Sequence, residues 1–348
     1  MLRTGTAAIV LLLTGALMPP ALAASFDCAK AGTAFEHAIC DVPDLSVADE
    51  VMAKAFATAI GGLTKPATSF MRADQRDWLD FAARSCTDDG ELLTGTARYD
   101  EEQAQCLDAA FGARTRVLEA SRMLGGHRFF VSSSYATEPD PDGVGDPDYF
   151  WKMATHAVSV PQLDGDDPLA EGFNAFIAAN GPKLADAIDP SAEDGQASAT
   201  SDSDDSLVVI SAGPGRITST LSTYWYGHGA AHGNGGTFYL HYLPKEGRGL
   251  EASDVFTGAG WEQKLLDLAV AQLNAAHGEW LMLDDPKDVA GAVIDPKRWS
   301  FDSDYGLTVQ FQPYEVAPYV YGAPTILLSW ESLEDIKANN ADPVRYGF

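Results

Sequence analysis

Residues 217–242 read ITSTLSTYWYGHGAAHGNGGTFYLHY, and this stretch indicates the fold class of the larger part of the chain. Tyrosine, threonine and other strand-forming residues dominate residues 217–226 and 236–242. Glycine and histidine fill the link between them, and such a link favours a loop. The stretch therefore predicts two strands joined by a glycine–histidine loop.

The segments on either side of this stretch add further strands and helices. Asp-, Pro-, Gly- and Ser-rich residues at 138–148 and 189–205 predict loops. Apolar and β-branched runs predict strands at 158–161, ending at Pro161, and at 207–211, 307–312 and 325–330. Apolar residues at helical spacing predict helices at 169–188, 260–277 and 330–336. Residues 127–340 are thus expected to form an α+β domain, a mixed or antiparallel sheet packed with helices.

Residues 25–124 have a helical pattern instead. Predicted helices begin at Asp44 and end before Gly61, run over residues 66–85, and run over about 97–124. A core of three short helices is small, so disulfides are expected to stabilise it.

Four cysteines lie in this helical module: Cys28, Cys40, Cys86 and Cys106. An even number of cysteines in an exported protein indicates disulfides, and three pairings are possible. We favour Cys28–Cys40 and Cys86–Cys106, because each pair closes a local loop. A zinc site is the alternative, but it is disfavoured because no Cys-x-x-Cys pair is present.

Residues 1–23 have the pattern of a signal peptide. Arg3 precedes an apolar run at 7–18, and Ala21-Leu22-Ala23 matches a cleavage site. No later segment has about 18 consecutive apolar residues, so no membrane span is expected after cleavage. The protein is predicted to be periplasmic or secreted, and an uncleaved N-terminal anchor is the alternative.

The chain is strongly acidic, with a net charge of −27, and removal of residues 1–23 with Arg3 makes it −28. Such a surface repels nucleic acid and anionic lipid and attracts cationic proteins. Nucleic acid is therefore not an expected partner. High solubility is the alternative explanation for the charge.

Residues 25–122 resemble the LprI-type lysozyme-inhibitor family. The resemblance rests on Ser25-Phe26-Asp27-Cys28-Ala29-Lys30, Glu36, Ile39-Cys40, Leu45, Asp49, Arg72, Gln75-Arg76, Trp78-Leu79, Cys86, Cys106-Leu107, Phe111 and Arg114.

Residues 155–336 resemble the lysozyme-binding ectodomain of the RsiV anti-sigma factor, which also occurs beside PdaC-type peptidoglycan deacetylases. The resemblance rests on Val160-Pro161-Gln162-Leu163, Phe173-Asn174-Ala175-Phe176-Ile177, residues 226–234, Leu250, Ser253-Asp254-Val255-Phe256 and residues 311–322. The deacetylase's catalytic module has no counterpart here.

Both resemblances imply a cationic lysozyme as the partner, bound by a stoichiometric inhibitor that is not an enzyme and needs no cofactor. Tyrosine supplies contact area at little entropic cost, so the segment 313–322 is the candidate binding segment. The alternative is that these tyrosines pack the end of the sheet and the prolines only shape the turn. The candidate partner-binding residues are Tyr226, His228, His232, Pro313, Tyr314, Glu315, Pro318, Tyr319 and Tyr321.

Two alternatives remain open from the sequence. One is a metal-dependent envelope hydrolase that uses His228 and His232, with His241 as a possible third ligand. A loop held by hydrogen-bonding histidines is favoured over this, because zinc normally takes three or four protein ligands, so no metal site is expected. The other alternative is a peptidoglycan-binding envelope protein.

Overall fold

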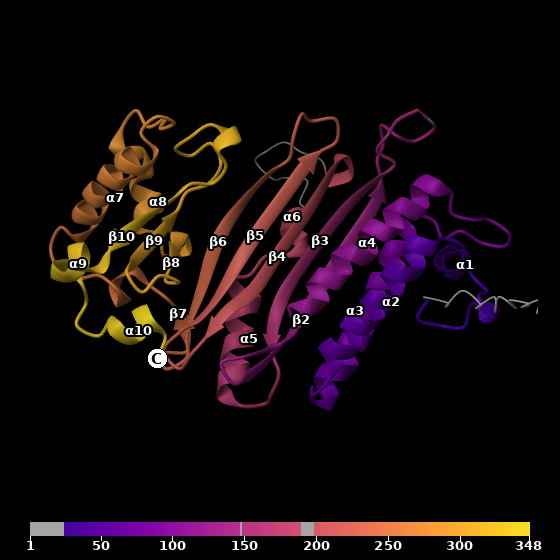
Figure 1. Ribbon diagram of the computed structural model, residues 1–348, viewed down its shortest axis with the longest axis horizontal. Coiled ribbons are helices and arrows are strands. Elements are labelled where there is room, and N and C mark those ends of the chain that lie inside the picture. Colours follow the sequence, from indigo (N-terminus) through magenta and orange to yellow (C-terminus); the bar gives the residue numbers. More distant parts are fainter. Residues whose placement is uncertain (1–23, 147, 189–197) are drawn as a thin grey trace, which may run out of the picture.

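The computed structural model describes residues 24–146, 148–188 and 198–348. It contains a seven-stranded sheet, a three-stranded sheet and helices around both, which confirms the predicted α+β class (Figure 1). The predicted signal peptide lies outside the described residues. Within the described part of the chain, no helix has the length and apolar character needed to cross a membrane.

The large sheet follows the order of the chain. Its strands lie in the order β1 to β7, and every neighbouring pair is antiparallel except β3 and β4, which are parallel. The strands are β1 (Met123–Leu124), β2 (His127–Pro139), β3 (Met153–Leu163), β4 (Ser201–Ala212), β5 (Ile217–Gly227), β6 (Asn234–Leu243) and β7 (Arg248–Gly249). The two strands predicted from residues 217–242 are β5 and β6.

The parallel pair requires a crossover, and α5 (Pro168–Asn180) and α6 (Leu184–Ala187) supply it. The Asp167 carboxylate caps α5 by accepting a hydrogen bond from the backbone N–H of Ala170. Phe173 and Ile177 of α5 are buried against one face of the sheet. The prediction of one helix over 169–188 was wrong, because Gly181-Pro182 separates the two helices.

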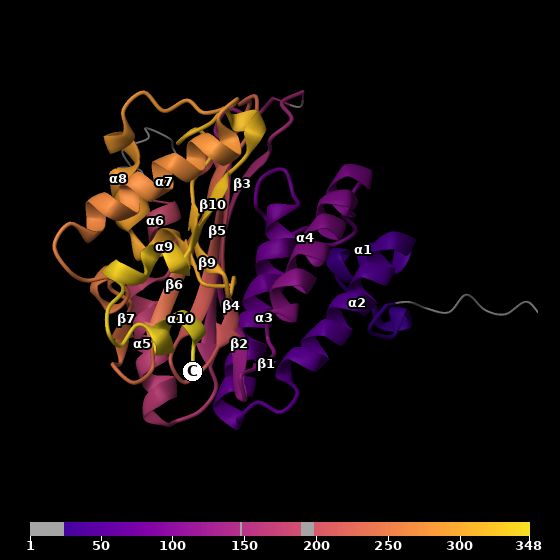
Figure 2. The ribbon, with the colours of Figure 1, turned by 60° about the vertical axis from the view of Figure 1, so that its left-hand side comes forward.

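The opposite face of the sheet is covered by the N-terminal helices (Figure 2). These are α1 (Ala34–Asp41), α2 (Pro43–Ile60), α3 (Lys65–Ser85) and α4 (Glu101–Glu119). The helix α1 was not predicted, and the third predicted helix extended too far, since Met123–Leu124 form β1 instead. Consecutive residues on β2 show the two-sided burial: Phe130 packs with the helices and Phe129 packs with α5.

The predicted disulfides Cys28–Cys40 and Cys86–Cys106 are both present. The first joins the residues just before α1 to that helix, and the second joins the end of α3 to α4.

A buried ion pair connects the helices to the sheet. The Arg114 guanidinium on α4 donates to the Asp74 carboxylate on α3, and their side chains are 1% and 2% exposed. Arg114 also donates to the Tyr135 hydroxyl on β2 at 2.8 Å, while Asp74 accepts from the Ser133 N–H at 2.6 Å. Arg114 also donates to the Gln75 side chain of α3 at 3.0 Å, which extends this network.

The C-terminal part builds the second sheet, in the order β10-β9-β8. A core around Trp299 and Phe256 lies between this sheet and α7, and Leu243 of β6 joins it. The predicted strands at 307–312 and 325–330 and the helix at 260–277 correspond to elements of this part. Its elements are α7 (Trp261–His277), α8 (Ala290–Ile294), β8 (Trp299–Ser300), β9 (Gly306–Gln310), β10 (Thr325–Ser329), α9 (Trp330–Leu333) and α10 (Asp342–Tyr346).

The strands β2, β3 and β4 depart furthest from the predictions. β4 begins at Ser201, so residues 201–205 form a strand and not the end of a loop; residues 189–197 lie outside the described part. β2 was not predicted at all. β3 continues through Pro161 to Leu163. Proline lacks an N–H, but β3 pairs with β4 only over residues 156–159, so no hydrogen bond to β4 is lost at Pro161.

Candidate partner-binding site

Three connections meet at one end of the large sheet. They are the β2–β3 link, the β5–β6 link and the β9–β10 link, and both ribbon views show them at the same end (Figures 1 and 2). We call this surface the loop end, comprising the described residues of 140–152, residues 228–233 and residues 311–324. Most of the residues predicted to bind a partner lie here.

The β5–β6 and β9–β10 links are joined by a stack of three rings. The His232 imidazole lies against the Tyr319 ring, with centroids 4.0 Å apart, and the Tyr319 and Tyr314 rings are 5.3 Å apart. The Tyr319 hydroxyl donates to the carbonyl of Gly233 at 2.8 Å, and the Tyr314 hydroxyl is 3.3 Å from Nε2 of His232. We call His232, Tyr314 and Tyr319 the ring stack.

Tyr314 has an unusual backbone conformation. Its φ of +67° makes it the one non-glycine residue with a positive φ in the described part of the chain, and its side chain is among the exposed aromatic groups. Such strained positions cluster at ligand-binding sites and persist only where the surroundings hold them. Here Glu315 holds the turn by accepting from the Gln312 N–H at 2.7 Å and pairing with Arg298 at 3.0 Å.

The other predicted partner-binding residues of the segment 313–322 set its backbone path and anchor it. Pro318 precedes a short 3₁₀ turn at Tyr319–Tyr321, and Pro313 directly precedes Tyr314. The Tyr321 hydroxyl lies 2.7 Å from Nδ1 of His277 at the end of α7. Tyr321 is thus anchored to α7 and does not join the ring stack.

His228 is separate from the ring stack and is buried between two carboxylates. Its Nδ1 is 2.5 Å from Asp140, and its Nε2 is 3.3 Å from Asp202. The Trp151 ring stacks on the imidazole at 5.7 Å, and the Tyr226 ring is tilted against both. These contacts connect the β2–β3 link, β4 and the β5–β6 link.

The geometry does not favour the metal-site alternative. The ring nitrogens of His228 face two carboxylates, whereas His232 contacts Gly233 and Tyr314. His241 is remote from both, in the core, where it bonds Thr218 and the Trp299 carbonyl. Across the residues that the structure describes, no three or more His, Cys, Asp or Glu side chains gather in a metal-binding group.

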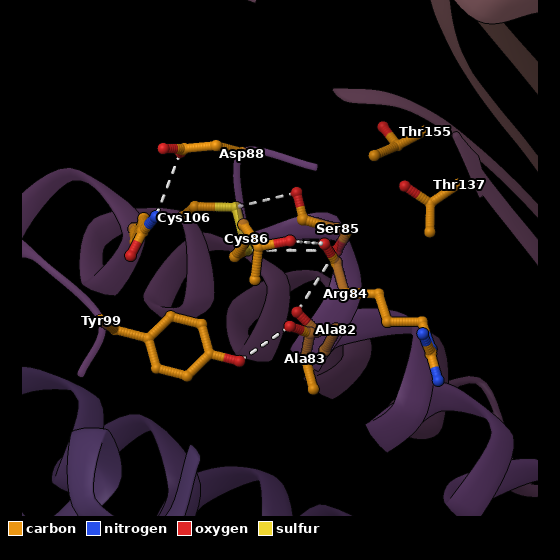
Figure 3. The surroundings of a disulfide bond; sticks show 12 residues. Ala82, Ala83, Arg84, Ser85, Cys86, Asp88, Tyr99, Cys106, Thr137 and Thr155 are labelled. Carbon is orange, nitrogen blue, oxygen red and sulfur yellow. Dashed lines mark hydrogen bonds between the residues drawn. A yellow bond between two sulfur atoms is a disulfide. The ribbon is translucent and has the colours of Figure 1, made fainter. Parts of the chain in front are cut away.

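A groove of about 430 Å³ extends the loop end toward the helices. It lies between the Cys86–Cys106 disulfide, whose surroundings Figure 3 shows, and the aromatic residues of the β2–β3 link. Acidic side chains dominate its charged lining, with Lys152 as the single basic one. The carboxylates are those of Asp88, Asp100, Glu102, Asp148 and Asp202, and the aromatic side chains are Tyr149, Phe150 and Trp151.

This acidic groove was missed by sequence analysis, because its walls come from segments far apart in the chain. The disulfide holds one wall, and Tyr99 supports it by donating to the Ala83 carbonyl at 2.7 Å (Figure 3). Burial raises the pKa of Tyr99 to about 12, so this donor keeps its proton at neutral pH. Phe150 is 70% exposed beside the groove. An exposed aromatic next to carboxylates suits a cationic, partly apolar partner.

One family model matches a part of the chain that contributes to this surface. Residues 253–331 match the family model described as "Protein of unknown function (DUF3298)". No curated protein matches the chain.

Similar solved structures include a DUF3298 family member from Bacteroides fragilis NCTC 9343, with 19% identity and a TM-score of 0.47 over 64% of this chain and 98% of that one. A DUF3298 family protein from Pseudomonas aeruginosa PAO1 has 16% identity and a TM-score of 0.38, again over 64% of this chain and 98% of its own. The residues that match the family model, 253–331, include the segment carrying Tyr314 and Tyr319.

Proposed function

We propose that this is a periplasmic or secreted binding protein that captures a cationic lysozyme and blocks its cleft stoichiometrically, without turnover. The observation that carries the proposal is the ring stack at the loop end, the end of the large sheet where the acidic groove also opens. The family resemblances of residues 25–122 and 155–336 supply the identity of the partner. The two disulfides fit an oxidising compartment.

The ring stack has the properties of an interface anchor. Tyr314 is 57% exposed and the neighbouring Val320 is 83% exposed, so both are available to a partner. Tyrosine is enriched among residues that dominate binding energy. The pairing of Glu315 with Arg298 fixes the Tyr314 turn before binding, which lowers the entropy that a partner must remove.

The charge of the protein supports the same partner. A net charge of −27 attracts a cationic protein over long range and raises the rate of encounter. The carboxylates of the acidic groove then offer partners for arginine or lysine side chains at close range. This attraction weakens with added salt, because the Debye length falls from about 10 Å at 0.1 M to about 3 Å at 1 M.

The test is the double substitution Tyr314→Ala and Tyr319→Ala, measured by surface plasmon resonance against hen egg-white lysozyme. We expect the affinity to fall at least tenfold, since each hot-spot tyrosine contributes about 2 kcal/mol or more. Tyr305→Ala is the matched control, because Tyr305 is 82% exposed and precedes β9, at the end of that strand away from Tyr314. Equal affinities of the double variant and the control would exclude the ring stack from the binding surface.

A further inference from the structure

A second hollow, of about 420 Å³, opens on the face of the large sheet that α5 covers. Side chains alternate along a strand, so every second residue of β4 lies on this face. Leu207 and Val209 are covered there with Phe173 of α5, whereas Ser203 and Asp205, on the same face, line the open hollow. The face therefore changes from an apolar core to a polar groove, which we call the sheet groove.

The neighbouring strands leave room in the sheet groove and place an aromatic ring in it. Trp225 of β5 pairs with Ser203 of β4, and both line the groove. The indole lies over Gly227, where a Cβ would come within 2.7 Å of the ring. A Cβ on Gly236 would meet the Gln312 side chain at 2.8 Å, so glycine keeps this wall open.

The buried imidazole of His156 on β3 orients the Ser203 hydroxyl. Nε2 of His156 is 2.9 Å from the Ser198 carbonyl, which can only accept, so Nε2 carries the proton. In the neutral ring Nδ1 is then an acceptor, and the Ser203 hydroxyl, 2.8 Å away, donates to it. The oxygen of Ser203 is thus left to accept a hydrogen bond from a ligand in the groove.

Asp205 adds a second acceptor. No lysine, arginine or histidine in the described part of the chain forms an ion pair with it. Burial, aided by the neighbouring charge of Asp204, raises the pKa of Asp205 to about 6. A half-buried carboxylate without a cation in a cleft is typical of a ligand-binding group.

We propose that the sheet groove binds one or two rings of a neutral oligosaccharide. A pyranose ring combines an apolar C–H face with many hydroxyl donors. The Trp225 indole packs against that face, while Ser203 and Asp205 accept from the hydroxyls. The carboxylates of Asp186 and Asp205 exclude anionic ligands, and the volume lies within the range of small-molecule sites. This binding is independent of the lysozyme proposal.

The experiment is titration calorimetry of the full mature protein with cellotriose and with N-acetylchitotriose. We expect saturable one-to-one binding of at least one of the two, and the comparison shows whether the acetamido group is recognised. Trp225→Ala should weaken this binding at least tenfold. Asp205→Asn, which keeps the side-chain shape, should weaken it at least fivefold.

Asp204→Asn is the matched control. It removes the same charge from the adjacent residue, which lies on the opposite face of β4 beside Arg116. The Asp204 variant should bind the sugar as the wild type does, and lysozyme should bind the Asp204 and Asp205 variants equally. Absence of binding by both sugars, or equal weakening by the two substitutions, would overturn the proposal, whatever the outcome with lysozyme.

Discussion

Replacing Arg114 with methionine removes the centre of the network that joins α3, α4 and β2. The change leaves the carboxylate of Asp74, 2% exposed, without its cation. It also removes the donors to Gln75 and Tyr135. Removing one partner of a buried ion pair costs about 3–5 kcal/mol. We therefore expect the free energy of unfolding to fall by about 3–5 kcal/mol.

The assay is equilibrium unfolding in urea, followed by far-UV circular dichroism, with the double variant Asp74→Asn and Arg114→Met as comparison. Asparagine removes the uncompensated charge and can still accept from the Ser133 N–H, which lies 2.6 Å from Asp74. The double variant should therefore recover about 2 kcal/mol of the loss. A loss of less than about 1 kcal/mol in the single variant, or a double variant no more stable than the single one, would show that this ion pair does not stabilise the fold as described.

Two further predictions concern the disulfides and pH. Replacing both Cys86 and Cys106 with serine should lower the free energy of unfolding by about 3 kcal/mol, because the disulfide closes a separation of 20 residues; an unchanged thermal midpoint would contradict this. Burial lowers the pKa of His241 from 6.5 to about 3, so the unfolded chain binds a proton that the folded protein does not. The free energy of unfolding should therefore fall as the pH drops from 6.5 toward 3 and be retained above 6.5. His241→Gln should reduce this dependence of stability on pH in unfolding curves recorded across that range. An unchanged dependence in the variant would show that other groups cause it.

The sequence predicted elements well where one pattern dominated. The helix over 66–85 and the strands in 217–242 follow from helical spacing and from strand-forming residues, and both are present. β2 escaped prediction because both of its faces are covered, so Phe129 and Phe130 are adjacent and the usual alternation is lost. The start of β4 looked like a loop because Ser and Asp fill it, yet pairing with β5 extends it.

The site was predictable only in the parts that lie together in the sequence. The tyrosines and prolines of residues 313–322 predicted a binding segment, and the rings of Tyr314 and Tyr319 do lie against each other. Single-sequence patterns cannot show that Asp140 and Asp202 flank His228, since the three residues come from different strands or links. The same holds for the sheet groove, which exists only after β4, β5 and β6 pair.

Lysozyme binding is tested most simply by titration calorimetry of the oxidised protein, residues 24–348, against a cationic lysozyme, with lysis activity assayed in parallel. The measurement is made at about 50 mM and about 300 mM salt, which screen charges weakly and strongly, respectively. We expect saturable binding near one to one, weaker at the higher salt, together with loss of lysis. Absence of binding at both salt concentrations would exclude a cationic lysozyme as the partner.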